Sequence, residues 1–281
     1  METRFHSIRH VSERCTGCIN CIKHCPTQAI RVRNGQAKII KELCIDCGEC
    51  IRVCPTHAMR GMYERMDATE KFKYIVALPS PAIFGQIRNL EDLDYVTTAL
   101  KRIGFDDVFE VSRAAEIVSE ATRKYMHSNS CKYPVISSAC PAIVRLIQLK
   151  FPDLCDLVLP IKQPMALAAK MARKEMVEKT GLNPEEIGIF YISPCTARVT
   201  EIKNPIFGEE SGIDGAIGIS EIYHQLVAEM EKLDKVEPIA NSGLIGVSWA
   251  IDGGESAALM SSHYLAADGI ENAINVLEEI E

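Results

Sequence analysis

Two copies of one cysteine run near the N-terminus constrain this chain more than any other feature of its sequence. Each copy has the spacing C-x2-C-x2-C-x3-C-P, one beginning at Cys15 and the other at Cys44. The likeness continues past the cysteines, because Cys25-Pro26-Thr27-Gln28-Ala29-Ile30 matches Cys54-Pro55-Thr56-His57-Ala58-Met59. An internal duplication of this kind predicts two equivalent structural units. The cysteines of the two copies are Cys15, Cys18, Cys21, Cys25, Cys44, Cys47, Cys50 and Cys54.

Thiols at this spacing indicate iron–sulfur chemistry more than disulfides or zinc. The first residues carry no apolar stretch of signal-peptide length, which argues against the oxidising compartments where disulfides form. Zinc sites rarely use so many cysteines at this cadence. The run instead resembles that of bacterial two-cluster ferredoxins, in which the fourth cysteine of each copy binds the other cluster. The resemblance implies two [4Fe-4S] clusters, one held by Cys15, Cys18, Cys21 and Cys54 and the other by Cys44, Cys47, Cys50 and Cys25.

Composition and charge narrow the possible functions. The chain is 47% hydrophobic and 25% charged, as ordinary globular proteins are, and no apolar run is long enough to predict a membrane span. Residues 1–66 carry 11 lysines and arginines against 6 aspartates and glutamates, or +5, so with a chain total of −7 the remainder carries −12. Two oxidised cubes of about −2 each would cancel most of the basic charge, so we expect no nucleic-acid partner. Cysteines in a chain without a signal peptide predict a cytoplasmic protein. Open iron–sulfur clusters predict that the organism is an anaerobe.

From residue 74 onward, apolar runs alternate with helical patterns, which predicts an α/β domain with a partly parallel sheet. The charged stretch 63–73 is interpreted as a linker. Ser220 is the expected N-cap of the helix that it begins. The predicted strands are 74–78, 107–111, 134–138, 187–192 and 216–219, and the predicted helices are 90–103, 113–126, 141–150, 165–180 and 220–233.

Two of the remaining cysteines follow predicted strands. Cys140 ends the strand 134–138 and precedes Pro141, and Cys195 ends the strand 187–192. The carboxyl ends of strands beside helix N-termini are where sites gather in α/β sheets, and the helix dipole favours a thiolate there. The alternative is that both are buried structural cysteines, the usual fate of a free thiol. Cys131 and Cys155 have no such context and are interpreted as structural.

The stretches around these two cysteines resemble signatures of the [FeFe] hydrogenase large chain. Residues 137–143 (SSACPAI) resemble T-S-C-C-P-x-W, and residues 193–201 (SPCTARVTE) resemble M-P-C-x-x-K-x-x-E. The stretches GFDDV, FPDL and GGESAA also look like that family, whose usual N-terminal partner is a two-cluster ferredoxin module. The resemblance implies an α+β ferredoxin-like module over residues 1–66, followed by an α/β hydrogenase-like domain over residues 67–281.

In that family the active cofactor is the H-cluster, a [4Fe-4S] cube joined through one thiolate to a two-iron unit that carries CO and CN⁻. Four cysteines hold its cube, and Cys140 and Cys195 match the first two. Glu201 matches the acidic residue of the second signature, and the resemblance places it in the same cofactor-binding site. The third signature, C-x-x-x-C followed by glycines, does not occur before Glu281. We therefore expect a C-terminally incomplete site, with an H-cluster only if the missing cysteines are supplied.

Departures from the family pattern concern proton transfer. The family moves protons through a cysteine, a glutamate, a serine and a second glutamate, and the matching positions here are Ala139, Glu120, Leu159 and Arg123. Methyl and isobutyl groups do not pass protons, and arginine does not release one at useful pH. Arg198 replaces the lysine that hydrogen-bonds a cyanide, which keeps a donor but changes its shape. We interpret Glu120 and Arg198 as remnants of the catalytic set.

Three functions follow from these patterns. The leading hypothesis is an iron–sulfur redox protein that senses H2 or redox state with little H2 turnover. The second is a non-catalytic, ferredoxin-type electron carrier on a hydrogenase-derived scaffold. The third, against which the relay positions argue, is an H2-evolving hydrogenase. Each implies a redox partner protein, either a ferredoxin or an oxidoreductase subunit, and the first and third also imply H2 as a ligand.

Overall fold

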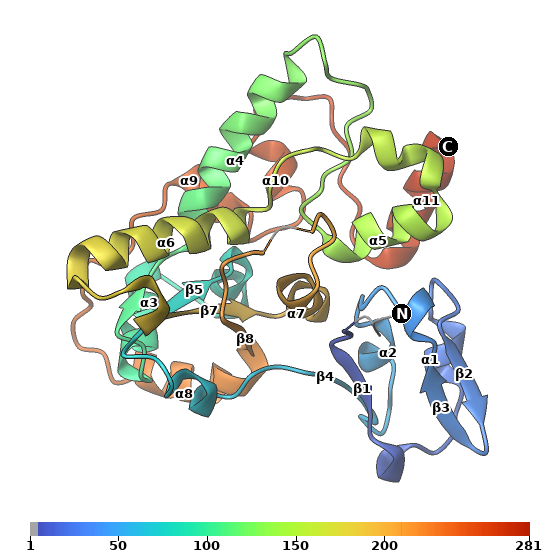
Figure 1. The fold of residues 1–281 in the computed structure, drawn as a ribbon, viewed down its shortest axis with the longest axis horizontal. Helices are drawn as coiled ribbons and strands as arrows, with labels where there is room; N and C mark the ends of the chain where they lie inside the picture. The colour runs from blue at the N-terminus through green and yellow to red at the C-terminus, as the bar shows by residue number, and fades with distance from the viewer. Residues whose placement is uncertain (1–4, 209) are drawn as a thin grey trace.

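The N-terminal part of the chain forms a small module of two short antiparallel sheets (Figure 1). The computed structural model describes residues 5–208 and 210–281. The first sheet pairs β1 (Ile8–His10) with β4 (Met59–Gly61), the two ends of the module. The second pairs β2 (Ile30–Arg33) with β3 (Gln36–Ile39). Because β1 and β4 close on each other, the cysteine runs between them are held in one compact unit.

The two copies of the cysteine run fold alike, as the duplication predicts. Each contributes a one-turn helix, α1 (Asn20–Lys23) in the first copy and α2 (Glu49–Arg52) in the second. The residues before these helices, Ile19 and Gly48, both have left-handed backbone with φ of 61° and 81°. This reversal turns the chain sharply, so that the cysteines on either side of it point inward.

A four-stranded parallel sheet forms the centre of the second part of the chain. The strand order is β6-β5-β7-β8, with β5 (Tyr74–Pro79) and β7 (Ile187–Ser193) in the middle. The edges are β6 (Asp107–Val108) and β8 (Gly215–Gly218). Every residue of β7 is buried, which is typical of a parallel sheet covered on both faces.

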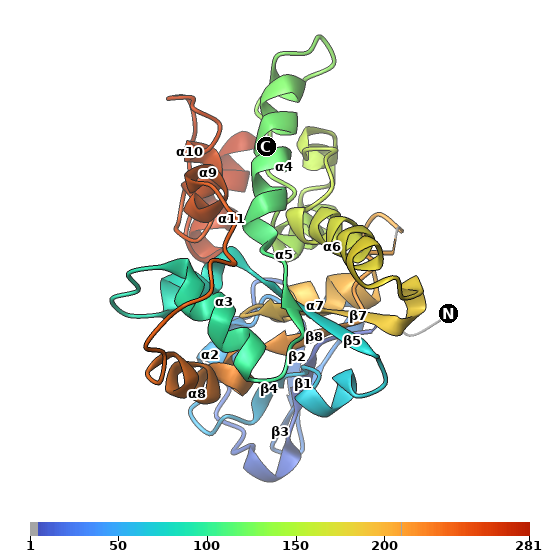
Figure 2. The same cartoon turned by 90° about the vertical axis from the view of Figure 1, so that its left-hand side faces the viewer.

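Helices cover both faces of this sheet (Figure 2). Successive side chains along a strand point to opposite faces of the sheet. Ala77 and Ile192 therefore pack in one apolar cluster, whereas Leu78 and Tyr191 pack in the other. The first cluster lies under α3 (Leu93–Arg102) and α8 (Ile219–Met230), and the second under α4 (Val111–Met126) and α6 (Pro164–Thr180). The predicted α/β layering is therefore present.

A further apolar cluster lies where the module meets the α/β part. It joins Ile45 of the second cysteine run to α5 (Pro141–Lys150), α7 (Thr196–Lys203) and α11 (Ile270–Ile280). Two short helices, α9 (Leu244–Ser248) and α10 (Gly254–Ala257), precede α11. No helix in the described ranges is long and apolar enough to cross a membrane.

The segment 63–73, interpreted as a linker, connects the two parts and is anchored to the sheet, because Glu64 forms a parallel bridge with Ile217 of β8. Two other expectations from the sequence were wrong. Residues 134–138 form no regular strand, and only Ile136 bridges to Val158, outside the four-stranded sheet. Ser220 lies inside α8, whose N-cap is Gly218. At Glu64 and Ile136 the contact is with a residue distant in sequence, which a short window of residues does not contain.

Close packing of α9 against α4 generates a prediction about stability. A Cβ atom at Gly246 would lie 2.1 Å from the carbonyl oxygen of Ser112 in α4. We expect Gly246→Ala to lower the free energy of unfolding by about 1–3 kcal/mol, because the backbones must separate to admit the methyl group. Urea denaturation measures this. Gly85→Ala is the control, since its nearest neighbour, the Ala250 carbonyl oxygen, lies at 3.4 Å; equal losses in both variants would contradict the packing argument.

Candidate functional site

The cysteines of the two runs surround two separate cavities. The first is lined by Cys15, Cys18, Cys21 and Cys54, and the second by Cys25, Cys44, Cys47 and Cys50. About 340 Å³ in the first and 330 Å³ in the second is not filled by protein atoms. Each cavity takes three thiols from one run and one from the other, the exchange that the ferredoxin resemblance implies. All of these cysteines are free thiols.

Burial raises the pKa of three thiols in the second cavity, those of Cys44, Cys47 and Cys50. It raises the pKa of Cys44 to about 12, with the Asp46 carboxylate adding to the shift, and it raises the pKa of Cys47 to about 11. Burial also raises the pKa of Cys50, and the neighbouring thiols add to that shift. Crowded thiols of this kind become thiolates only when a cationic centre compensates their charge. The donor set therefore fits an iron–sulfur cube, whose irons supply that charge.

The fourth cysteine of each run lies in a turn that donates a hydrogen bond to its sulfur. The Ala29 N–H donates to Cys25 Sγ at 3.1 Å, and the Ala58 N–H donates to Cys54 Sγ at 3.2 Å. At Cys54 burial opposes ionisation, but hydrogen bonds from the backbone and from the Thr56 hydroxyl outweigh it and lower the pKa. Such donors stabilise a negatively charged sulfur, and both cavities have one.

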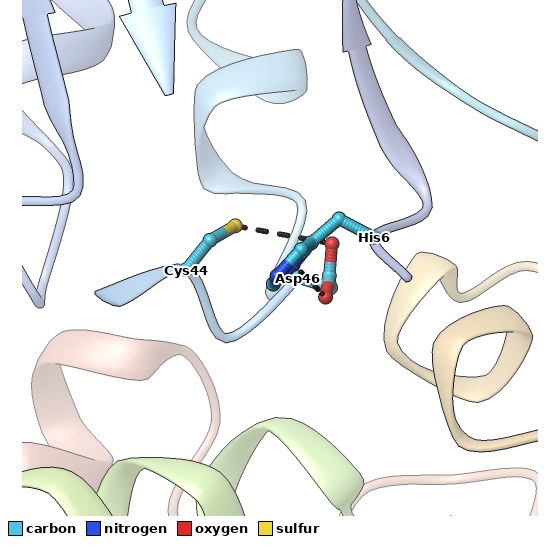
Figure 3. Close-up of side chains that lie close together, drawn as sticks. All are labelled: His6, Cys44 and Asp46. Carbon is cyan, nitrogen blue, oxygen red and sulfur yellow. Dashed lines mark hydrogen bonds and ion pairs between the residues drawn. The ribbon is translucent and has the colours of Figure 1, made fainter. Parts of the chain in front are cut away.

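His6, Cys44 and Asp46 form a buried group beside the second cavity (Figure 3). His6 Nδ1 lies 2.9 Å from Asp46 Oδ2, and Cys44 Sγ lies 3.8 Å from Asp46 Oδ1. The three donors are close enough to bind one metal ion, but Cys44 also lines the cluster cavity, and a separate ion would compete for its sulfur. Asp46 has a φ of 55° at the position that Gly17 occupies in the first copy, with 72°. We assign His6 and Asp46 to the support of this loop.

A buried polar network fixes the second cysteine run against α7. The Ser7 N–H is shared between Asp46 Oδ1 at 3.2 Å and Thr200 Oγ1 at 3.1 Å. The Ser7 hydroxyl donates to the Thr196 carbonyl at 2.6 Å, and the Thr196 hydroxyl donates to the Asp46 carbonyl at 2.7 Å. Thr200 donates to the Ser7 hydroxyl at 2.9 Å, which closes the network. Thr196 directly follows Cys195, so the network sets the position of Cys195 relative to the module.

Cys140 and Cys195 come together in the α/β part. Cys140 is the N-cap residue of α5 and Cys195 that of α7, so the positive ends of two helix dipoles lie at the two thiols. The surrounding protein raises the pKa of Cys140, the Cys195 thiol adds to the shift, and Arg198 opposes it. Cys140 remains accessible to solvent, whereas Cys195 is half-buried. This pair supplies two thiols of the four that a [4Fe-4S] cube takes from protein.

Polar side chains gather around this thiol pair. The Ser137 hydroxyl donates to Glu255 Oε1 at 2.5 Å and accepts from the Ala139 N–H at 3.0 Å. Burial raises the pKa of Glu255, while Ser137 and Arg198 oppose the shift. Arg198 donates to Gln163, so the guanidinium is fixed beside both Cys140 and Glu255. A carboxyl group from α10 therefore lies close to Ala139.

The remaining residues that the resemblance singled out have other partners. Glu120 pairs with Arg123 and with Lys124 of its own helix, and both arginine contacts hold the pKa of Glu120 below its usual value. Leu159 is buried. Glu201 forms a buried ion pair with Arg145 at 3.2 Å and accepts from the Ile206 N–H. These contacts account for Glu201 structurally, and its place in a cofactor site stays a prediction.

Sequence reasoning missed several of these residues. Glu255 lies in the family-like stretch GGESAA, but its contact with Ser137 had no signal, because Ser137 lies far away in the chain. Asp46 had a signal, since it replaces the left-handed glycine of the first copy at Gly17. Of the two cysteines interpreted as structural, Cys131 is half-buried and Cys155 is exposed, so Cys155 is not part of the core.

Removal of one cluster ligand generates a testable difference in iron content. We expect anaerobically reconstituted protein to hold about eight irons in its two cubes, and Cys47→Ala to hold about four, because the second cavity loses a thiolate that the cube requires. Iron and acid-labile sulfide assays measure this. Cys155→Ala is the matched control and should keep the full content. Equal iron in both variants would remove Cys47 from the ligand set.

The raised pKa of Glu255 generates a prediction about pH. The folded state keeps a proton on Glu255 above the ordinary glutamate pKa, where the unfolded state has already lost it, so the free energy of unfolding falls as pH rises through this window. Glu255→Gln removes this dependence. We expect the variant to gain stability relative to the native sequence as the pH rises above the ordinary glutamate pKa, measured by urea denaturation. A constant difference as the pH rises would show that Glu255 titrates normally.

Comparisons with known proteins agree with this geometry. Residues 73–281 match the family model described as iron only hydrogenase large subunit, C-terminal domain, and residues 7–55 match a 4Fe-4S dicluster domain. Iron hydrogenase 1 of Clostridium pasteurianum is 26% identical over 224 residues, which cover 74% of this chain and 39% of that protein. The NADP-reducing hydrogenase subunit HndD of Solidesulfovibrio fructosivorans is 24% identical over 239 residues, covering 82% and 37%. The chain thus spans about two fifths of these relatives.

A solved structure shows the same fold. A variant of the [FeFe]-hydrogenase HydA1 from Chlamydomonas reinhardtii superposes with a TM-score of 0.50 and 23% sequence identity, over 66% of this chain and 52% of that one. The family match extends over most of the α/β part and includes both Cys140 and Cys195. The chain belongs to the iron-only hydrogenase large-subunit family and carries a 4Fe-4S dicluster domain at its N-terminal end.

Proposed function

We propose that this protein passes electrons through two [4Fe-4S] clusters toward the Cys140 and Cys195 pocket and senses H2 or redox state with little H2 turnover. One observation carries the proposal: Cys47 of the second cavity and Cys195 line the same cleft and pack in the same apolar cluster. An electron on the second cluster would thus be next to the pocket of the hydrogenase-like domain. The proposed division lies at residue 66, with the module before it and the domain after it.

The pocket itself limits what this chain does alone. An H-cluster, when bound, supplies the metal centre at which H2 is split or formed. Its cube needs four thiolates, and the described residues bring two together, so the donor set is half complete. Arg198 would place a positive charge next to that pocket, with the Glu255 carboxyl beside it. The sensing role therefore depends on two further cysteine ligands.

Slow turnover is proposed because the matching relay positions do not carry protons. Ala139 and Leu159 have no exchangeable side-chain proton, and Arg123 is engaged by Glu120 and by the Ala258 carbonyl. General acid–base catalysis contributes typically 10²–10⁴-fold to a rate, so this loss is large on the scale of turnover. A protein that binds H2 but releases protons slowly is better suited to sensing H2 than to producing or consuming it at a high rate.

A second function, electron transfer without H2 chemistry, is favoured by the half-complete thiol set. In that case the clusters carry electrons and the α/β domain is a docking scaffold. Cys140→Ser separates the two functions in the longest form of the protein: it should abolish any spectroscopic response to H2 under the sensing proposal and leave dithionite reduction of the module unchanged under both. If the native protein itself shows no response to H2, the sensing function is excluded and electron transfer without H2 chemistry remains.

Partners and location are proposed on the same basis. The Solidesulfovibrio relative is, by name, a subunit of an NADP-reducing hydrogenase, which works with other subunits. We propose that this protein likewise exchanges electrons with a ferredoxin or an oxidoreductase subunit. A cytoplasmic location is proposed from the cysteines, because open clusters and the four cysteines outside them are favoured by a reducing environment.

The turnover proposal gives a measurable outcome. With an H-cluster assembled in a form that supplies the missing ligands, we expect H2 evolution from reduced methyl viologen to be at least about 100-fold below that of a relay-complete family member. Ala139→Cys restores the first relay position and should raise the rate, though not fully, because Leu159 and Arg123 still interrupt the path. Family-typical rates in the native sequence, measured anaerobically, would overturn the sensing proposal.

A further inference from the structure

A cleft between the module and the α/β part reaches both candidate redox sites. It offers about 870 Å³ to solvent and is lined on the module side by α2, β1 and β4, and on the other side by the loop before α7 and the start of α8. Cys47 lines it from the second cluster cavity, and Cys195 lines it from the hydrogenase-like pocket. The cleft is therefore an opening through which a redox group outside the protein could approach the second cluster.

The module side of the cleft is basic. Arg9 and Arg60 line it and form no ion pair among the described residues, and the exposed His57 lies with them. The two acidic residues of the lining are Glu49 and Glu221, and Glu49 is already paired with Arg52 at 2.6 Å. The cleft thus presents unpaired arginines in a chain whose residues after 66 carry −12.

The two arginines are placed at a cost to the fold. Arg9 and Arg60 are directly opposite each other in the β1–β4 pair. Like charges at such positions repel and destabilise a two-stranded ribbon, and this ribbon is short. Neither arginine takes part in an ion pair among the described residues, so the fold itself does not explain why two arginines face each other here. An anion that binds between them would turn this repulsion into attraction.

We propose that this cleft is the docking site of a small electron-carrier protein with an acidic surface around its redox group. The acidic surface would bind Arg9 and Arg60, and the redox group would then lie over Cys47. The negative charge of the rest of the chain directs such a partner to the cleft, since opposite charges steer association and like charges exclude it elsewhere. This inference rests on the proposed function, because it requires a cluster in the second cavity.

The site also fixes where electrons enter. Cys18 of the first cavity is exposed at the other end of the module, so a partner could in principle reach the first cluster there. The duplication offers a direct comparison of the two ends. Arg31 in the first copy is equivalent to Arg60 in the second, and their side chains donate to the equivalent carbonyls of Gln28 and His57. Only Arg60 of this pair lines the cleft.

The test uses a flavodoxin, a small acidic carrier, reduced to its hydroquinone. One electron leaves the flavin, which becomes the semiquinone, and the module gains one electron. Stopped-flow absorbance follows both changes in the native protein and in Arg60→Glu and Arg31→Glu. We expect Arg60→Glu to slow the second-order rate about tenfold at low ionic strength and Arg31→Glu to change it less than about twofold. The difference should shrink as salt is added, since exposed charges are screened.

Each outcome decides between the sources of an effect. Equal slowing by both variants, or greater slowing by Arg31→Glu, would overturn the docking site and place electron entry at the first cluster. A free nucleotide tests whether a small anion occupies the cleft instead. If it binds native protein and Arg60→Glu equally well and does not change the rate of flavodoxin oxidation, a small anion is excluded as the occupant and a protein is supported. Dithionite bleaching and iron content are measured in all variants. If the protein contains no iron and does not bleach with dithionite, the clusters are refuted and the proposed function with them. If the clusters are intact and the variants oxidise flavodoxin at the native rate, only the docking site is refuted.

Discussion

The position of Cys195 relative to the second cysteine run is the constraint on which the site depends, and a buried hydrogen-bond network sets it. Ser7, Asp46, Thr196 and Thr200 come from three distant parts of the chain, and each hydrogen-bonds another member of the group. A net gain of about 1 kcal/mol per hydrogen bond is modest, but loss of one member leaves buried partners unsatisfied, which costs more. The network therefore acts mainly as a specifier of geometry: it allows one docked arrangement of the module and penalises others.

The same observation explains how far the sequence could be read. The cysteine spacing is a local pattern, and its resemblance to two-cluster ferredoxins predicted which thiols lie around each of the two cavities. The apolar runs of β5 and β7 are also local, and both strands lie where these runs predicted them. In contrast, the Thr196 hydroxyl and the Asp46 carbonyl are brought together only by the fold, and the short stretch around either residue does not predict their hydrogen bond. The failed strand at 134–138 has the same origin, because its only bridge, at Ile136, is to a residue outside the sheet.

The hydrogenase-like pocket combines two thiols with a small set of polar partners. Two helices begin at Cys140 and Cys195, and at Cys140 burial and the neighbouring Cys195 thiol raise the pKa although a helix N-terminus lies there. Glu255 approaches the thiol pair from α10 through Ser137, whereas Glu120 is paired with Arg123 on α4. The planar guanidinium of Arg198 is held by Gln163. The charged side chains next to the two thiols are therefore Glu255 and Arg198.

The bridge between Glu64 and Ile217 has a consequence beyond the connection of two domains. The Glu64 N–H donates to the Ala216 carbonyl at 2.9 Å, and its carboxylate accepts from the Ala216 N–H at 3.1 Å and from Lys203. β8 is the last strand of the sheet, and its outer backbone groups would otherwise be free to pair with another chain. The segment that leaves the iron–sulfur module thus protects the sheet from edge-to-edge association. Any cut or loosening at this segment would expose an aggregation-prone edge, so solubility and the integrity of the electron-transfer module are linked in this protein.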